Sequence, residues 1–244
     1  MPSEPRCLQN TLVWQSPEEI TDHQANAAYI RTLLSSDSSF FHCIRDRASL
    51  LRNHTPCTVD RTKCSRGGYS ISLPIVFEDG VYWLLRMTCP SNPNQANLKC
   101  DSDAVTSRMI ESSVITREYV RNHTTIPVPR VHFHDSRCNN PLKAPFIVMD
   151  FVDGVPIPFS DLDAENETQA SKIYKQLGQI SYQLSKLRFD KIGGISTASN
   201  SQPVLGPKFW APNSGPAHST APLPTHLNTT NPSQPNTGTM PPPL

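Results

Sequence analysis

Two alternating apolar runs around an Asp-Gly pair constrain this fold more than any other feature. Residues 69–77 (YSISLPIVF) and 81–87 (VYWLLRM) place apolar side chains at every second position, which is the period of a β-strand. Asp79–Gly80 between them is a strong turn signal, so the segment is predicted to form a β-hairpin. Because Pro74 lacks a backbone N–H, we expect its strand to lie at a sheet edge or to contain a bulge.

Helical signals lie on both sides of this hairpin. Ser16, Pro17 and Glu19 have the pattern of a capping box with proline at the first helical position, which predicts a helix over 16–35. Apolar spacing and polarity predict three further segments: a helix over 39–52, a polar loop over 88–104 and a helix over 106–122.

The strongest helical pattern comes later in the chain. Five aliphatic residues recur at intervals of four, three, four and three: Ile173, Leu177, Ile180, Leu184 and Leu187. This spacing puts them on one face of an amphipathic helix, which we expect over 167–188. An Ile-Pro-Val-Pro breaker at 126–129 precedes two short predicted strands, 130–134 and 145–151.

From about residue 200 the chain changes character. Eleven of the last 44 residues are proline, and the others are mostly Ser, Thr, Asn and Gly without apolar periodicity. Such a segment cannot bury enough apolar surface to offset its ordering entropy, so residues 201–244 are predicted to be a disordered, proline-rich tail.

Charge and cysteine usage narrow the functional classes. The net charge is only +1, so we expect no nucleic-acid partner and no membrane partner, both of which usually require a basic face. No apolar run approaches the about 18 residues of a membrane span, and the first ten residues lack the apolar stretch of a secretory signal. Seven cysteines without a C-x-x-C pair favour reduced thiols and a cytoplasmic location. The irregular spacing of His54, Cys57 and Cys64 does not predict a metal site.

Five segments, in order over about 65–195, resemble the aminoglycoside phosphotransferase family, in its large fungal branch of kinase-like proteins. Residues 65–69 (SRGGY) resemble the nucleotide loop, and 77–80 (FEDG) together with 83–86 (WLLR) resemble the hairpin that follows it. The other similar segments are 119–131 (YVRNHTTIPVPRV), 145–154 (PFIVMDFVDG, the hinge) and 189–193 (FDKIG).

The resemblance implies an α+β fold with the N-lobe of a protein-kinase-like fold, which is an antiparallel sheet plus a helix. The N-lobe and hinge would occupy 57–154, after an N-terminal helical segment over 1–56. One or two helices that begin a C-lobe would follow over 155–200, and the disordered tail over 201–244 would end the chain.

The resemblance also implies an ATP site, with magnesium held only through the nucleotide. Gly67 and Gly68 would let backbone N–H groups approach the phosphates, although a Gly-Gly pair can equally form an ordinary turn. Arg86 occupies the position of the phosphate-binding cation; the alternative is a solvated arginine. The hinge would offer the carbonyl of Asp150 and the amide of Val152 to an adenine edge, with Met149 behind it; the alternative is a buried strand without a ligand.

Two departures from the family reduce the expected activity. Ser113 stands where the third helix should carry the glutamate that pairs with the strand cation, so nucleotide binding is expected to be weak. The catalytic H-x-D-x-x-x-x-N and a later Asp should follow the helix that ends near 188, but no Asp occurs after Asp190. Asp135 and Asn140 match D-x-x-x-x-N in a predicted surface turn before the hinge. We therefore assign no catalytic residue.

Three interpretations follow. The favoured one is a kinase-like N-lobe and hinge cut off before the catalytic lobe, by gene decay or by a wrong splice or frame, so that the chain is a pseudokinase-like remnant. The second is a non-catalytic binding or regulatory protein that uses the apolar face of the helix over 167–188 to contact a protein partner. The third is an active enzyme whose missing lobe another chain supplies.

Overall fold

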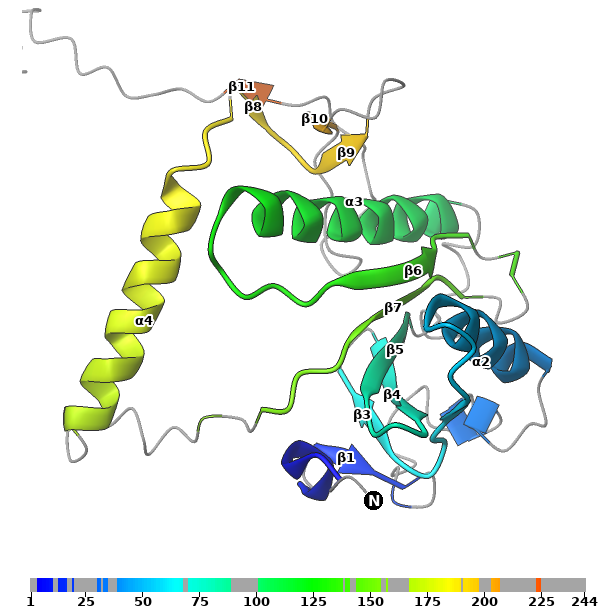
Figure 1. Ribbon diagram of the computed structural model, residues 1–244. Helices are drawn as coiled ribbons and strands as arrows, with labels where there is room; N and C mark the ends of the chain where they lie inside the picture. The colour runs from blue at the N-terminus through cyan, green and yellow to red at the C-terminus, as the bar shows by residue number, and fades with distance from the viewer. Residues whose placement is uncertain are drawn as a thin grey trace, which may run out of the picture.

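A computed structural model of the chain is drawn in Figure 1. The structure describes residues 4–10, 13–16, 19, 30–31, 33–34, 39–67, 70–88, 101–137, 139–140, 144–154, 157, 167–189, 191–197, 203–206 and 223–224. The helical elements are η1 (Arg6–Gln9, a 3-10 helix), α2 (Ser39–Leu51), α3 (Asp101–His123) and α4 (Glu167–Ser185). The strands are β1 (Trp14–Gln15), β2 (Cys57–Val59), β3 (Cys64–Arg66), β4 (Ser70–Phe77), β5 (Tyr82–Thr88), β6 (Val131–Asp135), β7 (Phe146–Asp150), β8 (Lys191–Ile192), β9 (Ile195–Thr197), β10 (Pro203–Leu205) and β11 (Leu223–Pro224).

Seven of these strands form one antiparallel sheet. Its order is β1-β3-β4-β5-β7-β6, and β2 pairs with the part of β4 that β3 leaves free. Helices α2 and α3 lie beside this sheet (Figure 1). The arrangement confirms the α+β class and the antiparallel sheet.

The predicted hairpin is present as β4 and β5. The two strands pair in one register from Ser70 opposite Thr88 to Val76 opposite Tyr82. In the turn, Gly80 has a φ of 80° and donates its N–H to the Phe77 carbonyl at 2.9 Å. Glycine adopts this left-handed conformation without the steric cost of a Cβ, which is why Asp-Gly predicts the turn.

The expectation that Pro74 would put its strand at a sheet edge or mark a bulge was wrong. Its strand β4 lies inside the sheet, because β5 flanks one side and β2 and β3 share the other. Pro74 falls between the residues that pair with β2 and those that pair with β3, and its carbonyl accepts the Asp60 N–H at 2.8 Å. Proline is tolerated there because neither short ladder requires an N–H at that position.

The alternation in β5 separates the core from the second face of the sheet. Trp83, Leu85 and Met87 are buried in the main core, to which α2 contributes Phe41, Ile44 and Ala48. The intervening side chains of Tyr82, Leu84 and Arg86 lie on the opposite face. There α3 contributes Val114 to a smaller cluster with Ile147 and Met149 of β7.

Helix α3 begins earlier than expected. It starts at Asp101, inside the stretch predicted to be a loop. Asp101, Ser102 and Asp103 are polar, but residues of this kind are favourable in the first turn of a helix because its N–H groups are unpaired. These three polar residues, which were predicted to lie in a loop, therefore begin a helix.

The N-terminal region contains a confirmed and an unexpected feature. The Ser16 N–H donates to Glu19 Oε2 at 2.7 Å and the Glu19 N–H to Ser16 Oγ at 3.3 Å, which is the predicted capping box. Residues 20–29 of the predicted helix lie outside the described residues, whereas Ile30 and Leu34 are helical and buried. Elements η1 and β1 were not predicted.

The region after the hinge contains α4 as predicted, followed by short strands that were not predicted. Strand β9 pairs with β10 and β8 pairs with β11, and Figure 1 shows these strands beside α3, away from the large sheet. Strands β10 and β11 lie within residues 201–244, the segment predicted to be a disordered tail. In strand β10, Val204 pairs with Ser196 and Leu205 with Ile195 of β9, and branched apolar residues such as valine favour extended backbone. Apart from 203–206 and 223–224, residues 201–244 lie outside the described residues.

Candidate functional site

One row of side chains on β5 organises the predicted site. Tyr82, Leu84 and Arg86 are at alternating positions and lie on the face of α3. In the adjacent strand, Met149 is opposite Leu84 and Ile147 is opposite Arg86. The fold thus brings Arg86 and Met149, which are 63 residues apart in sequence, to neighbouring strands on the same face.

Arg86 is exposed and is held by a serine that sequence reasoning missed. Its Nε donates to Ser70 Oγ at 3.1 Å, and Ser70 itself is buried. The alternation of polar Ser70 and Ser72 with apolar residues in β4 was a signal that these serines would share the face of Arg86. The bond orients the guanidinium while leaving its other donors for solvent or a ligand.

Gly67 lies next to the same serine. Its N–H donates to the Ser70 carbonyl at 2.8 Å, so this amide is already engaged in the turn. A Cβ at Gly67 would meet Ser70 Oγ at 3.5 Å, an ordinary contact. Steric packing therefore does not require glycine there. Gly68 lies outside the described residues.

The hinge residues have different environments. Met149 is buried against α3. The Asp150 side chain accepts hydrogen bonds from the Arg130 N–H and from His132 Nε2, both at 2.8 Å, and so fastens the ends of β6 and β7 together. Val152 is 63% exposed.

Ser113, the residue in place of the expected glutamate, is bound to a second arginine. Arg117 Nη1 donates to the Ser113 carbonyl at 3.1 Å and also to its hydroxyl. Burial and, after it, the neighbouring Arg86 charge lower the pKa of the Arg117 guanidinium. Among the described residues, neither arginine forms an ion pair with a carboxylate. Arginine remains protonated, so two positive charges meet between β5 and α3.

The N-terminal segment covers the other end of the row. Cys7, Leu8 and Trp14 form a buried cluster against Tyr82, Leu84 and Phe151. The ring centroids of Trp14 and Phe151 are 5.9 Å apart, and those of Tyr82 and Phe151 are 5.7 Å apart.

This segment is also hydrogen-bonded to the hinge. The Cys7 N–H donates to Asp153 Oδ1 at 2.9 Å, and the Cys7 thiol approaches the Val152 carbonyl at 3.8 Å. Lys63 binds both Glu4 and the Leu8 carbonyl and holds the segment from β3's side. Sequence reasoning missed these contacts because the first fifteen residues have no strong periodicity.

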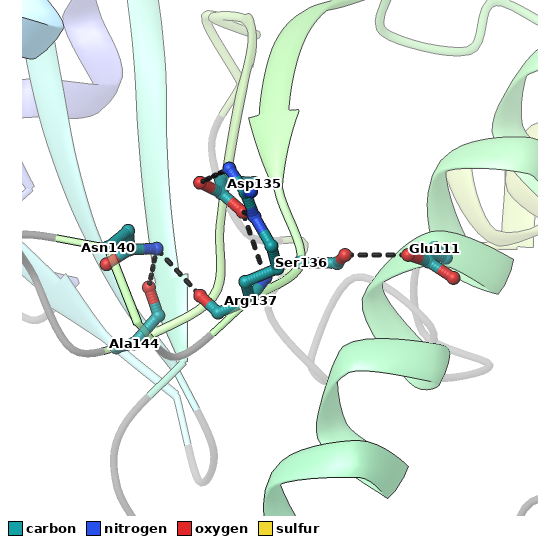
Figure 2. A network of polar contacts seen from close by, with 6 residues as sticks. All are labelled: Glu111, Asp135, Ser136, Arg137, Asn140 and Ala144. Atoms are coloured by element: carbon teal, nitrogen blue, oxygen red, sulfur yellow. Dashed lines mark hydrogen bonds and ion pairs between the residues drawn. The ribbon is translucent and has the colours of Figure 1, made fainter.

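Asp135 and Asn140 form part of a structural turn (Figure 2). Asp135 accepts three hydrogen bonds from Arg137, from the backbone N–H, Nε and Nη2. Asn140 Nδ2 donates to the carbonyls of Arg137 and Ala144, at 2.8 and 2.9 Å. The D-x-x-x-x-N match is therefore a surface turn, as predicted.

The same network explains why Glu111 does not replace the missing glutamate. Glu111 Oε1 accepts the Ser136 hydroxyl at 2.7 Å and thereby links α3 to the end of β6 (Figure 2). Its carboxylate is committed to this contact and forms no ion pair with Arg86 in the described structure.

Comparison with known proteins found distant relatives. No family model matches the chain, and no solved structure matches it. Proteins named "altered inheritance of mitochondria protein 9, mitochondrial" match 102 residues, 26% identical in Candida dubliniensis and 24% in Candida albicans. The match covers 40% of this chain and only 16% of the length of each relative. Within the described residues, no helix has the length and apolar character needed to cross a bilayer.

Proposed function

We propose that this chain is the nucleotide-cradling half of a kinase-like phosphotransferase of the aminoglycoside phosphotransferase type, without the residues that transfer the phosphate. The observation that supports it best is the row on β5. An exposed arginine, held by buried Ser70, lies two positions from Leu84, and buried Met149 stands on the adjacent strand that leads into the hinge. In this arrangement the arginine suits the phosphates of a nucleotide, and the apolar surface suits its base.

The first test is catalytic. We expect no phosphoryl transfer from magnesium-ATP to small hydroxyl compounds. Positioned acidic groups and metal ions supply most of this catalysis, and we assign no catalytic acidic residue in this chain. The measurement is product formation by the purified chain. A turnover of about 1 s⁻¹ or more, within the range of roughly 1–100 s⁻¹ for kinases, would contradict the proposal.

The second test is binding. We expect weak ATP binding that depends on Arg86, since no carboxylate supports this cation. A thermal-shift titration measures it, because ligand at 100 times its dissociation constant adds roughly 2.7 kcal/mol to stability. Arg86→Ala should abolish the shift, and Arg121→Ala, an exposed arginine near the end of α3, is the matched control. Equal shifts in both variants would make Arg86 a solvated surface residue.

A second candidate function is a binding or regulatory role through α4. Its predicted stripe is open to solvent: Leu177 is 51% exposed, Ile180 36% and Leu184 42%. Figure 1 shows α4 apart from the sheet and its covering helices. A protein partner on this face would bury side chains that are costly to leave exposed. Loss of the partner's binding in Leu177→Gln and Leu184→Gln, with ATP binding unchanged, would favour this role.

Location is a separate part of the proposal. The cysteine usage favours a reducing compartment and led us to expect the cytoplasm, whereas the yeast relatives carry a mitochondrial name. Imaging of a fluorescent fusion beside a mitochondrial marker distinguishes the two. Coincidence with the marker would replace the cytoplasmic location by a mitochondrial one.

A further inference from the structure

We propose that this site recognises the polyphosphate part of its ligand and keeps the base excluded behind the N-terminal segment. The inference rests on the proposed function and deepens it. It makes inorganic tripolyphosphate as good a ligand for the chain as ATP. Two independent features of the β5 row support it, one at each end.

The end of the row at Arg86 fits an anion. Arg86 is exposed. Half-buried Arg117 lies one helical turn after Val114, through which α3 packs on this same face of the sheet. Neither guanidinium is neutralised by a carboxylate in the described part of the chain. Their remaining N–H groups, beside the hydroxyls of Ser70 and Ser113, match the donors that phosphate oxygens accept. A polyphosphate would relieve the repulsion between the two cations.

The end of the row at Tyr82 and Leu84 is closed. Leu84 is packed between the α3 cluster and the cluster of the N-terminal segment, so its side chain has apolar neighbours from both. The Cys7 N–H bonds to the hinge at Asp153, and the Cys7 thiol contacts the carbonyl of Val152, the residue whose amide is predicted to meet a base edge. A base could enter only if Cys7, Leu8 and Trp14 left this face. That displacement would expose buried apolar surface.

The consequence is a ligand preference that does not depend on the base. ATP should bind the intact chain by its phosphates alone, with the N-terminal segment in place. Adenosine, which has no phosphate, should not bind. Weakening the segment should improve ATP binding but leave tripolyphosphate binding unchanged, because only ATP has a base to place on Leu84.

The experiment titrates the full chain with tripolyphosphate, ATP and adenosine by calorimetry at fixed ionic strength. We expect the dissociation constants of tripolyphosphate and ATP to agree within about threefold. Arg86→Gln and Arg117→Gln should each weaken both by about tenfold or more, as expected for loss of a charge-assisted contact. Arg121→Gln, on the same helix as Arg117, controls for the general loss of one charge and should change neither.

Leu8→Ala tests the closed end of the row. It removes part of the buried cluster and should raise ATP affinity relative to tripolyphosphate. Because this variant could unfold, thiol labelling of the wild-type chain provides a second measurement. Buried Cys7 should label slowly beside exposed Cys43, and neither ATP nor tripolyphosphate should accelerate it.

The outcomes separate this inference from the proposed function. If ATP binds far more tightly than tripolyphosphate, or exposes Cys7 when it binds, the base enters the intact site and the inference fails while the proposed function stands. If no phosphate compound binds, both fail. If tripolyphosphate binds through both arginines but Leu8→Ala never favours ATP, the preference for polyphosphate stands. The proposed function then fails in one part, because the site would bind polyphosphate and not a nucleotide.

Discussion

His132 joins the hinge strand to the core through two contacts. Its ring stacks on Trp83, with centroids 3.5 Å apart and 12° between the planes, and Nε2 is 2.8 Å from Asp150 Oδ1. Burial lowers the pKa of this imidazole, and the opposing effect of Asp150 is smaller. The neutral ring can donate its Nε2 proton to the carboxylate and remain stacked, so the folded protein favours the neutral form.

This environment predicts a pH-dependent stability. Because the pKa of His132 is lower in the folded chain than the about 6.5 of the unfolded chain, the unfolded state binds the proton more readily. The stability that His132 contributes should therefore be present above about pH 6.5 and lost as pH falls toward the folded pKa. Urea unfolding measured across this window should show the loss. His132→Gln should flatten the profile, while the same change at exposed His134 should not. An unchanged profile in His132→Gln would contradict the assignment.

At the scale of elements, β5 and α4 carry similar apolar residues in opposite environments. Leu85 in β5 is 0% exposed and belongs to the main core, whereas Leu177 in α4 is 51% exposed. The helical pattern of α4 is as regular as that of a buried helix. Within the described residues its surroundings are mostly solvent, with Gln183 bonded to Thr125 as one link to the segment after α3.

The two leucines should therefore respond differently to substitution. Leu85→Ala should lower the free energy of unfolding by about 2–5 kcal/mol, because it leaves a cavity in a packed core. Leu177→Gln should change it by less than about 0.5 kcal/mol, because the side chain is already solvated. It should also reduce binding of a hydrophobic dye. Chemical denaturation and dye fluorescence measure both. A loss in Leu177→Gln as large as that in Leu85→Ala would mean that α4 is covered in solution.

At the scale of the whole molecule, three segments cover the two faces of one sheet. Helix α2 packs on the main core, α3 on the opposite face, and the N-terminal segment on the part of that face that α3 leaves uncovered. Helix α4 lies apart from this unit, whereas β9 lies against α3 (Figure 1). The proposed function requires further chain to face the exposed side of α4 and to supply acidic residues.

This requirement predicts the content of the coding sequence beyond about residue 215. In the family that the chain resembles, the catalytic motif follows the segment similar to 189–193, so we expect one of the three forward frames to encode H-x-D-x-x-x-x-N followed by a further Asp. Sequencing of the transcript and translation of the downstream DNA measure this. If no frame encodes the motif and the transcript ends as the chain does, the binding role through α4 becomes the leading proposal.

The local elements of this fold could be predicted from the sequence because their signals are local. Alternating apolar residues around Asp79–Gly80 specified the hairpin, and its turn needs a conformation that glycine readily adopts. The capping box at Ser16 and the regular spacing in α4 are likewise encoded within a few residues. The alternation along β5 likewise places Arg86 on the face opposite the core side chains.

The surroundings of the site were decided by tertiary structure. Arg117 beside Arg86, Ser70 beneath it, and Cys7 against the hinge are contacts between residues 16 to 146 positions apart, and no local pattern announces them. The position of Pro74 inside the sheet likewise depends on two strands that share one side of β4. Hydrophobic burial is nondirectional, so the apolar pattern of a segment determines which of its faces is covered but not which segment covers it.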